Sequence, residues 1–401
     1  MRTGQTHLFI PGPTNTPEAV RQAMNVPMQD MRAADFGDLT LPLFEDLKTL
    51  FRTQTGQVMM FPGSGTAAWE AAITNTLNPG DKVLMARHGQ FSTLWVDMAQ
   101  RLGLDVQVVD VPWGAGVPHK EFARLLGRDK HDEIKAVFVT HNETATGVAS
   151  DVAAVRRALD ENFHDALLFV DGVSSIGAMD FRMDDWGVDL AVSGSQKGLM
   201  LPAGLGLLGV SAKALEAARH ATMRRAFFDF ADMLRFNADG YFPYTPPTPL
   251  LHGLRASLDR ILRQEGLDAV IARHHRLAEG VRRGISAWGL ELVAEHHSLW
   301  SDTVSAIRVP DSIDAREVLR IAYEDLNASF GSGLGRLSGK AFRIGHLGDM
   351  NEGMCLTALS LAEIALTRAG MPLRLGQGVA AAQAFFAFDA ASRPMLRVAA
   401  E

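Results

Sequence analysis

An aspartate and a lysine follow two apolar, strand-like runs of the sequence, twenty-six positions apart. Asp171 ends the run ALLFVD (166–171), and Lys197 stands in GSQKG directly after VDLAVS (188–193). Ligands of parallel α/β sheets bind where the carboxyl ends of the strands meet, so we expect both side chains at one ligand-binding edge. A lysine buried there has a lowered pKa and can act as a nucleophile or a base, whereas a lysine in water stays charged.

A third segment at the same edge leads directly into a helix. The residues PGSGTAAWEAA (62–72) follow a short apolar run at 58–61. Free N–H groups at a helix start, together with the helix dipole, favour a phosphate group, although a glycine turn alone is often only a turn. A lysine, an aspartate and a phosphate cradle together match pyridoxal 5'-phosphate. The lysine would form a Schiff base with its aldehyde, and the aspartate would keep its pyridine nitrogen protonated.

Two other ligand classes are weighed against this interpretation. The hexapeptide GLGLLG (204–209) fits the G-x-G-x-x-G pattern of dinucleotide-binding proteins. That pattern requires a helix that opens on its last glycine, whereas these glycines lie inside an apolar, strand-like run. His88, His141 and His346 lie near the candidate segments, but no histidine and carboxylate cluster has ligand spacing. The sequence therefore predicts no metal site.

An alternating framework of strands and helices must position these residues. Apolar runs at 82–86, 105–111, 134–140, 166–171 and 188–193 are typical of buried strands, and the residues between them show helical periodicity. This alternation predicts an α/β fold with a mainly parallel sheet covered on both faces. The run LGLLGV (205–210) follows its predecessor without a helix, so we expect it to run antiparallel.

Changes of pattern along the chain predict three parts. Prolines recur through the first twenty-seven residues and favour an extended N-terminal arm, residues 1–25, rather than a helix. The alternating pattern spans a large cofactor-binding domain, residues 26–264. A long helical stretch then opens a smaller α+β C-terminal domain, residues 265–401. The glycine-rich stretch 331–339 is interpreted as a loop that lets this domain close on a substrate.

Composition indicates a soluble protein of the cytoplasm. Apolar residues make up 47% of the chain, charged residues 21%, and the formal net charge is -7. No basic patch offsets that charge, which argues against nucleic-acid or anionic-membrane partners. One cysteine, Cys355, suits a reducing compartment. The first residues lack the pattern of a signal peptide, and no apolar run approaches the ~20 residues of a membrane helix.

Several longer motifs resemble those of the class V aminotransferases. They are FIPGPTNTPEAV, THNETATGV, FVDGVSSIGAMDFRMDDWGVDLAVSGSQKG, YTPPTPLLHGLRASLD and GKAFRIGHLG. The resemblance runs from about residue 7 to 369. It is greatest for the serine–glyoxylate branch of the family, followed by the alanine–glyoxylate branch. It implies the type I fold of pyridoxal phosphate enzymes, working as a homodimer with active sites at the subunit interface.

The resemblance also implies roles for single residues. Lys197 would be the Schiff-base lysine, Asp171 the partner of the pyridine nitrogen, and Arg343 the group that binds the substrate α-carboxylate. Further residues would bind the cofactor in the same subunit: Ser64, Gly65, Thr66, Phe91, Thr144, Val173 and Gln196. The alanine-specific relatives have histidine in place of Thr66 and tryptophan in place of Phe91.

The resemblance implies roles for three further residues, which lie in other parts of the chain. Tyr244 and Thr245 would reach the phosphate bound in the neighbouring subunit. Asn15 would contact the substrate from the N-terminal arm, in the PGPTN segment.

The implied activity is transfer of the amino group of L-serine to glyoxylate, giving hydroxypyruvate and glycine by a ping-pong mechanism. Alanine or aspartate as donor is the main alternative, and Arg32 is a candidate contact for an aspartate side chain. A cysteine desulfurase would need a cysteine on a mobile loop, whereas Cys355 lies in a helical pattern. A non-enzymatic nucleotide-binding α/β protein is the alternative from a different class.

Overall fold

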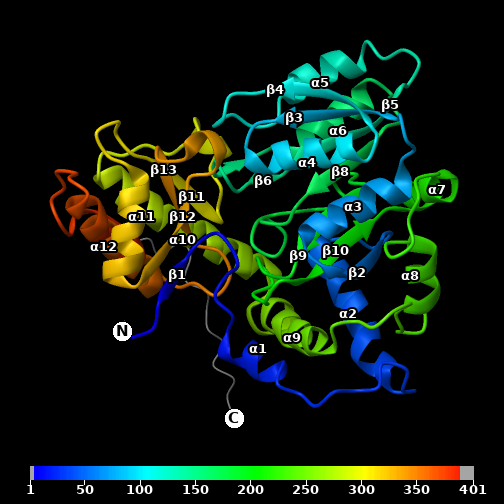
Figure 1. Cartoon of the computed structure of the whole chain (residues 1–401), viewed down its shortest axis with the longest axis horizontal. Helices are drawn as coiled ribbons and strands as arrows, with labels where there is room; N and C mark the ends of the chain where they lie inside the picture. The colour runs from blue at the N-terminus through cyan, green and yellow to red at the C-terminus, as the bar shows by residue number, and fades with distance from the viewer. Residues whose placement is uncertain (1–3, 389–401) are drawn as a thin grey trace.

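The computed structural model describes residues 4–388, and these contain two large separate sheets and one two-stranded hairpin (Figure 1). The larger sheet has seven strands. In spatial order they are β2 (Gln57–Gly63), β10 (Gly204–Val210), β9 (Leu190–Gly194), β8 (Leu167–Asp171), β5 (Ile134–Thr140), β3 (Lys82–Arg87) and β4 (Asp105–Asp110). Only β10 runs antiparallel to its neighbours, as the missing helix before it predicted. The glycines of GLGLLG lie inside this strand, so they do not open a helix.

Helices cover the large sheet because its strands are apolar on both faces. The helices between the strands are α3 (Gly65–Thr76), α4 (Gln90–Arg101), α5 (His119–Leu126) and α6 (Val152–Glu161). The side chain of Asp151 caps α6 by accepting the Ala154 N–H, a role for which aspartate is a preferred residue. The other helices of this domain are α2 (Phe36–Phe51), α7 (Ala212–His220), α8 (Phe230–Asn237) and α9 (Thr248–Leu258), and α9 continues into a π-helix, Asp259–Glu265.

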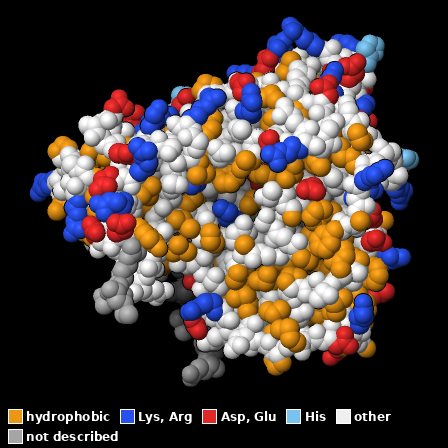
Figure 2. Space-filling model, viewed as in Figure 1, with side chains coloured by type: hydrophobic (Ala, Val, Ile, Leu, Met, Phe, Trp, Pro, Cys, Tyr) orange, Lys and Arg blue, Asp and Glu red, His pale blue; other side chains and the backbone are white. Residues whose placement is uncertain are grey.

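Hydrophobic side chains gather on one face of the large domain (Figure 2). Met28, with an exposed fraction of 78%, and Leu94 and Phe227, each 44% exposed, are among the large apolar side chains in contact with solvent. An exposed apolar surface of this kind is typical of a face that another protein covers.

The smaller sheet combines the C-terminal part of the chain with its N-terminal arm. Its strand order is β1 (His7–Phe9), β12 (Ala328–Ser332), β13 (Ala341–Gly345) and β11 (Val304–Arg308). The helices α10 (Leu267–Ala287), α11 (Ala315–Leu326), α12 (Glu352–Arg368) and α13 (Gln377–Phe388) pack around it. Short 3-10 helices at His297–Leu299 and Gly335–Leu337 complete this domain, so part of the glycine-rich stretch 331–339 is helical and part belongs to β12.

The N-terminal arm connects the two sheets. Strand β1 pairs in parallel with β12, and the Phe9 and Phe330 rings stack 5.7 Å apart. Thr14 then binds the large domain, because its N–H donates to Gln196 O at 3.1 Å. The expectation of a fully extended arm was wrong at α1 (Glu18–Ala23). Pro17 stands immediately before this helix, where a proline costs no hydrogen bond.

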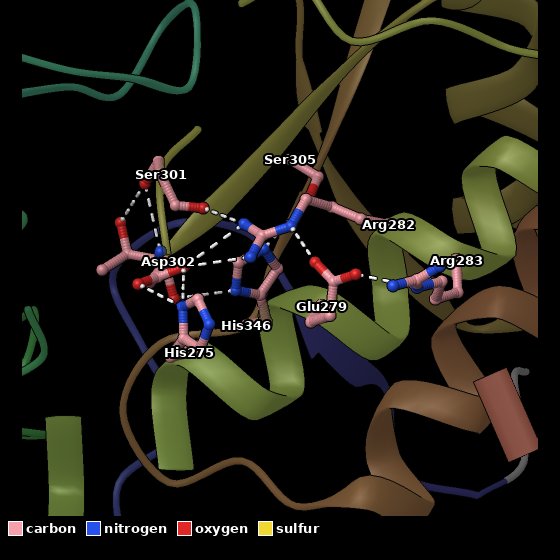
Figure 3. A network of polar contacts seen from close by, with 9 residues as sticks. His275, Glu279, Arg282, Arg283, Ser301, Asp302, Ser305 and His346 are labelled. Atoms are coloured by element: carbon pink, nitrogen blue, oxygen red, sulfur yellow. Dashed lines mark hydrogen bonds and ion pairs between the residues drawn. The ribbon is translucent and has the colours of Figure 1, made fainter. Parts of the chain in front are cut away.

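A polar network holds the loop 301–303 of the small domain against α10 (Figure 3). Arg282 donates to the backbone carbonyl of Ser301 at 3.0 Å and to the carboxylate of Asp302, which also binds His275. The amide of Asn142 donates to the Thr303 hydroxyl at 2.7 Å from the short hairpin β6 (Asn142–Glu143) and β7 (Val148–Ala149). The network therefore ties the small domain to a turn of the large domain.

Candidate active site

A cavity of about 320 Å³ lies at the carboxyl ends of β8 and β9, in front of the first turn of α3. Its wall contains nine of the residues predicted from the sequence: Ser64, Gly65, Thr66, Phe91, Thr144, Asp171, Val173, Gln196 and Lys197. These residues come from five segments of the chain. The topology brings them together because the strands that precede them are neighbours and, apart from β10, run in one direction.

The amine of Lys197 lies between the large domain and the N-terminal arm. Its Nζ donates a hydrogen bond to Pro11 O at 2.6 Å, and the backbone carbonyl of Lys197 accepts the Thr14 hydroxyl. Burial, together with the positive charge of Arg343, lowers the pKa of Lys197 to about 8, although Asp171 opposes the shift. A side chain at Gly12 would place its Cβ 2.4 Å from Nζ, so only glycine fits beside this amine.

Asp171 ends β8 with its side chain buried. One carboxylate oxygen accepts the Val173 N–H at 2.9 Å, which orients the group. Burial raises the pKa of Asp171 to about 7; the bond from Val173 opposes this shift, and the nearby carboxylate of Glu143 adds to it. A cationic group placed beside this carboxylate would therefore bind strongly. Burial has removed the water that would otherwise stabilise the negative charge, and the cation would take its place.

The start of α3 is open to an anion. Ser64 is its N-cap residue, but the Ser64 side chain makes no capping hydrogen bond, and the first turn contains no acidic residue. The Oε1 atom of Gln196 is buried in the same wall without a hydrogen-bond partner. A Cβ at Gly65 would lie 2.4 Å from Val173 Cγ2, so the close approach of helix and strand end requires glycine. The free N–H groups at the helix start fit a phosphate group, and the NH₂ end of the Gln196 amide could add a further donor to it.

Arg343 approaches the site from β13 of the small domain. It is 7% exposed, and its guanidinium donates to Ser332 O at 2.9 Å and to Thr144 O at 3.0 Å. Burial lowers the pKa of Arg343 to about 10, an effect that Glu143 opposes. Arg343 borders a neighbouring hollow of about 390 Å³, which shares Gly12 with the first cavity. A carboxylate there would meet a desolvated cation.

Besides Arg343, four candidate residues do not border the cavity that contains Lys197. Asn15 uses its amide to donate to Leu8 O at 3.1 Å, within the arm. Tyr244 stacks on Phe227 with ring centroids 4.0 Å apart, and Thr245 and Arg32 are exposed. The cofactor role of Tyr244 and Thr245 therefore requires a second subunit.

Glu143, which was not among the residues predicted from the sequence, supports the wall of the site. Its buried carboxylate accepts the N–H groups of Ser92 at 2.9 Å, Phe91 at 3.3 Å and Ala145 at 3.1 Å. It therefore caps α4, where the preceding residue, Gly89, has no side chain to do so. Burial raises the pKa of Glu143, while these N–H groups oppose the shift. The motif THNETATG contained the signal: an acid among small polar residues after a strand.

The remaining cysteine and histidines have structural surroundings. Cys355 lies inside α12, as its helical pattern predicted, and burial raises the pKa of its thiol to about 12. His141 is buried, with Nδ1 2.9 Å from the Ser175 hydroxyl, and His346 lies 3.1 Å from Ser305 Oγ. Burial lowers the pKa of His88 to about 4. A buried thiol with a raised pKa does not suit desulfurase chemistry.

Comparison with known proteins identifies the family. The sequence model of the family described as Aminotransferase class-V matches residues 6–325. The chain belongs to this family. As a class V aminotransferase, it uses pyridoxal phosphate, and the open start of α3 beside Lys197 and Asp171 fits that cofactor.

Relatives of this aminotransferase are similar over almost their whole length. The chain is 59% identical to the serine–glyoxylate aminotransferase of Hyphomicrobium methylovorum, over 96% of this chain and 95% of the relative. It is 56% identical to the L-aspartate–glyoxylate aminotransferase of Paracoccus denitrificans, over 95% and 96%. The crystal structure of pyridoxamine–pyruvate aminotransferase from Mesorhizobium loti is 28% identical, with a TM-score of 0.90 over 97% of this chain and 100% of that one.

No helix within residues 4–388 is both long and apolar enough to cross a membrane.

Proposed function

We propose that this aminotransferase transfers the amino group of L-serine to glyoxylate, giving hydroxypyruvate and glycine. The observation that carries the proposal is that Lys197, Asp171 and the open start of α3 share one cavity. The identity of 59% with a serine–glyoxylate aminotransferase supports the choice of donor and acceptor.

Pyridoxal phosphate, when bound, supplies an electron sink for amino acids that lose their α-proton. The N–H groups at the start of α3 and the amide of Gln196 would hold its phosphate. Phe91 and Val173, on the cavity wall, would contact the ring. Asp171 would pair with the ring nitrogen and retain a proton on that atom, since a carboxylate with lost hydration gains most from a cationic partner.

Lys197 moves the proton in this proposal. A base must be neutral, and burial with the charge of Arg343 lowers the pKa of Lys197 from 10.5 to about 8, so the neutral fraction of the amine at pH 7 rises from well under 1% to roughly a tenth. The carbonyl of Pro11 holds Nζ in place through its hydrogen bond of 2.6 Å. Arg343 would bind the substrate carboxylate with its planar guanidinium, and its bonds to Thr144 and Ser332 fix the direction of approach.

A homodimer with shared sites is part of the proposal. Tyr244 and Thr245 do not border the cavity of their own subunit, which supports a role in the neighbouring one. The exposed apolar face in Figure 2 offers a surface for a second copy. A cytoplasmic location is also proposed, supported by the single cysteine.

The proposal is tested with a matrix of donors and acceptors. Serine with glyoxylate is expected to give the highest kcat/KM among serine, alanine and aspartate donors, measured as glycine formation. Lys197→Ala is expected to lower that rate by about 10³-fold or more, because both the base and the covalent anchor are lost. Glycine formation by Lys197→Ala at a rate near that of the unchanged protein would end the proposal.

Aspartate is the second candidate donor. The 56% identity with an L-aspartate–glyoxylate aminotransferase is nearly as high as the 59% with the serine enzyme. Arg32 is exposed in this structure. In the site of a neighbouring subunit it would contact the side-chain carboxylate that aspartate carries and serine lacks. If aspartate is the donor, Arg32→Gln raises KM for aspartate and leaves KM for serine unchanged; if serine is the donor, aspartate turnover is low in both proteins.

A further inference from the structure

Trp69 is a buried aromatic residue of α3 whose indole nitrogen has no partner. Its side chain borders the cavity that also contains Asp171, and only 4% of the residue is exposed. The Nε1 atom is fully buried and makes no hydrogen bond. A buried N–H without an acceptor is costly, and such groups in native proteins call for a specific explanation.

A stack of aromatic rings fixes the orientation of this indole. Trp69 stacks on Trp95 with centroids 5.4 Å apart, and Trp95 meets Phe138 edge-on at 4.8 Å. Phe138 in turn stacks on Phe169 at 4.3 Å, across the paired strands β5 and β8. Because each ring is held by the next, the Trp69 side chain has little freedom to rotate.

The same stack places Trp69 on the face of the sheet toward which Asp171 points. Phe169 and Asp171 are separated by one residue on β8, and alternate residues of a strand point to the same face. The electrostatics agree with this placement. The Trp69 N–H acts on Asp171 as a side-chain donor that lowers the pKa of the carboxyl, in opposition to the larger effect of burial, although its geometry falls short of a full hydrogen bond.

We propose that Trp69 is a positioning residue for the aminotransferase reaction: its indole N–H donates to the Asp171 carboxylate when the cofactor ring is bound. The proposal rests on the proposed pairing of Asp171 with the ring nitrogen. A second donor beside Val173 would favour the ionised carboxylate and hold it in the direction of the ring. The Trp69 N–H then lacks an acceptor only in the cofactor-free protein. There it lowers the stability of the folded protein, because a buried donor without a partner is unfavourable.

This role makes cofactor affinity and stability respond differently to loss of the N–H. Trp69→Phe keeps an aromatic ring in the stack and removes the donor. We expect its dissociation constant for pyridoxamine 5'-phosphate to rise about tenfold, which corresponds to about 1.4 kcal/mol. This probe lacks the aldehyde and cannot react with Lys197, so equilibrium dialysis reports the non-covalent contacts. The melting temperature of the cofactor-free protein should stay the same or rise.

Trp95 provides a matched control. Its Nε1 is also buried without a partner, and it belongs to the same stack, but it does not border the cavity. Trp95→Phe should therefore leave the affinity for pyridoxamine phosphate unchanged. If Trp69→Phe does not fold, Trp69→Leu removes the same donor from a smaller side chain and is measured in its place.

A double-mutant cycle with Asp171→Ala decides whether Trp69 acts through the aspartate. In the Asp171→Ala background, Trp69→Phe should change the dissociation constant no further. Equal losses in both backgrounds, or a lower melting temperature with unchanged affinity, would overturn the inference and assign Trp69 to the core alone. Failure of the unchanged protein to bind pyridoxamine phosphate would instead overturn the proposed function.

Discussion

At the scale of single residues, the chemistry depends on an amine that loses its proton near neutral pH. Lys197 differs from an ordinary lysine in two respects. It is largely buried, and Arg343 lies close enough to disfavour its positive charge. Both effects lower the pKa from 10.5 to about 8, so the neutral form that attacks a carbonyl becomes abundant at a pH more than two units lower. The same amine would be almost fully charged on the surface.

The pH dependence of cofactor attachment tests this shift. We expect the rate at which cofactor-free protein attaches pyridoxal phosphate, measured after borohydride fixation, to rise with pH and reach half its maximum near pH 8. Arg343→Gln should move that midpoint upward. In the unchanged protein the positive charge of Arg343 lowers the pKa of Lys197, so removing that charge raises it. A blocked lysine derivative in solution serves as the control. A midpoint at the pH of this free amine would contradict the argument.

At the scale of elements, the phosphate cradle depends on how closely α3 approaches the residues after β8. Gly65→Ala would force a Cβ to within 2.4 Å of Val173, so either the helix start or the ring contact must move. We expect the change to cost about 1–3 kcal/mol of stability and to weaken pyridoxal phosphate binding. Gly353→Ala in the first turn of α12 is the control, because its Cβ would meet only Asn351 Oδ1 at an ordinary 3.4 Å. Thermal melting and cofactor titration that show the same effect for both variants would refute the prediction.

Features that depend on neighbouring residues of the sequence could be predicted from it. Features that depend on contacts between distant parts of the chain could not. Asp171 and Lys197 could be found because each follows an apolar run, and parallel strands place such ends together. Trp69 could not be singled out as a site residue, because the apolar periodicity of a helix does not show which of its side chains borders a cavity. Capping of α4 by Glu143 joins residues fifty-one positions apart, and no spacing rule connects them. The pairing of β1 with β12 joins residues such as His7 and Ala328, which are much farther apart in sequence.

At the scale of the whole molecule, the arm and one turn join the two domains at the site. Thr14 binds the backbone beside Lys197, while β1 of the same arm is a strand of the small sheet. On the other side, the Asn142 amide reaches Thr303, and Arg343 reaches Thr144. Movement of the small domain would therefore displace both the carbonyl that holds Lys197 and the guanidinium offered to the substrate. Any movement of the small domain would therefore be coupled to the alignment of these groups by the chain itself.

The proposed dimer would extend this coupling to a second chain, and it gives the last prediction. If Thr245 binds the phosphate of the neighbouring subunit, then Thr245→Glu places a carboxylate against that phosphate and abolishes activity, as Lys197→Ala does in the other half of the site. Mixed dimers of the two variants contain one site with both intact residues, so random reassociation should restore roughly a quarter of the sites. Mixing two preparations of the same variant is the control, and the measurement is glycine formation after denaturation and joint refolding. Sites built within one subunit would give no recovery, because every subunit in the mixture would then carry a damaged site.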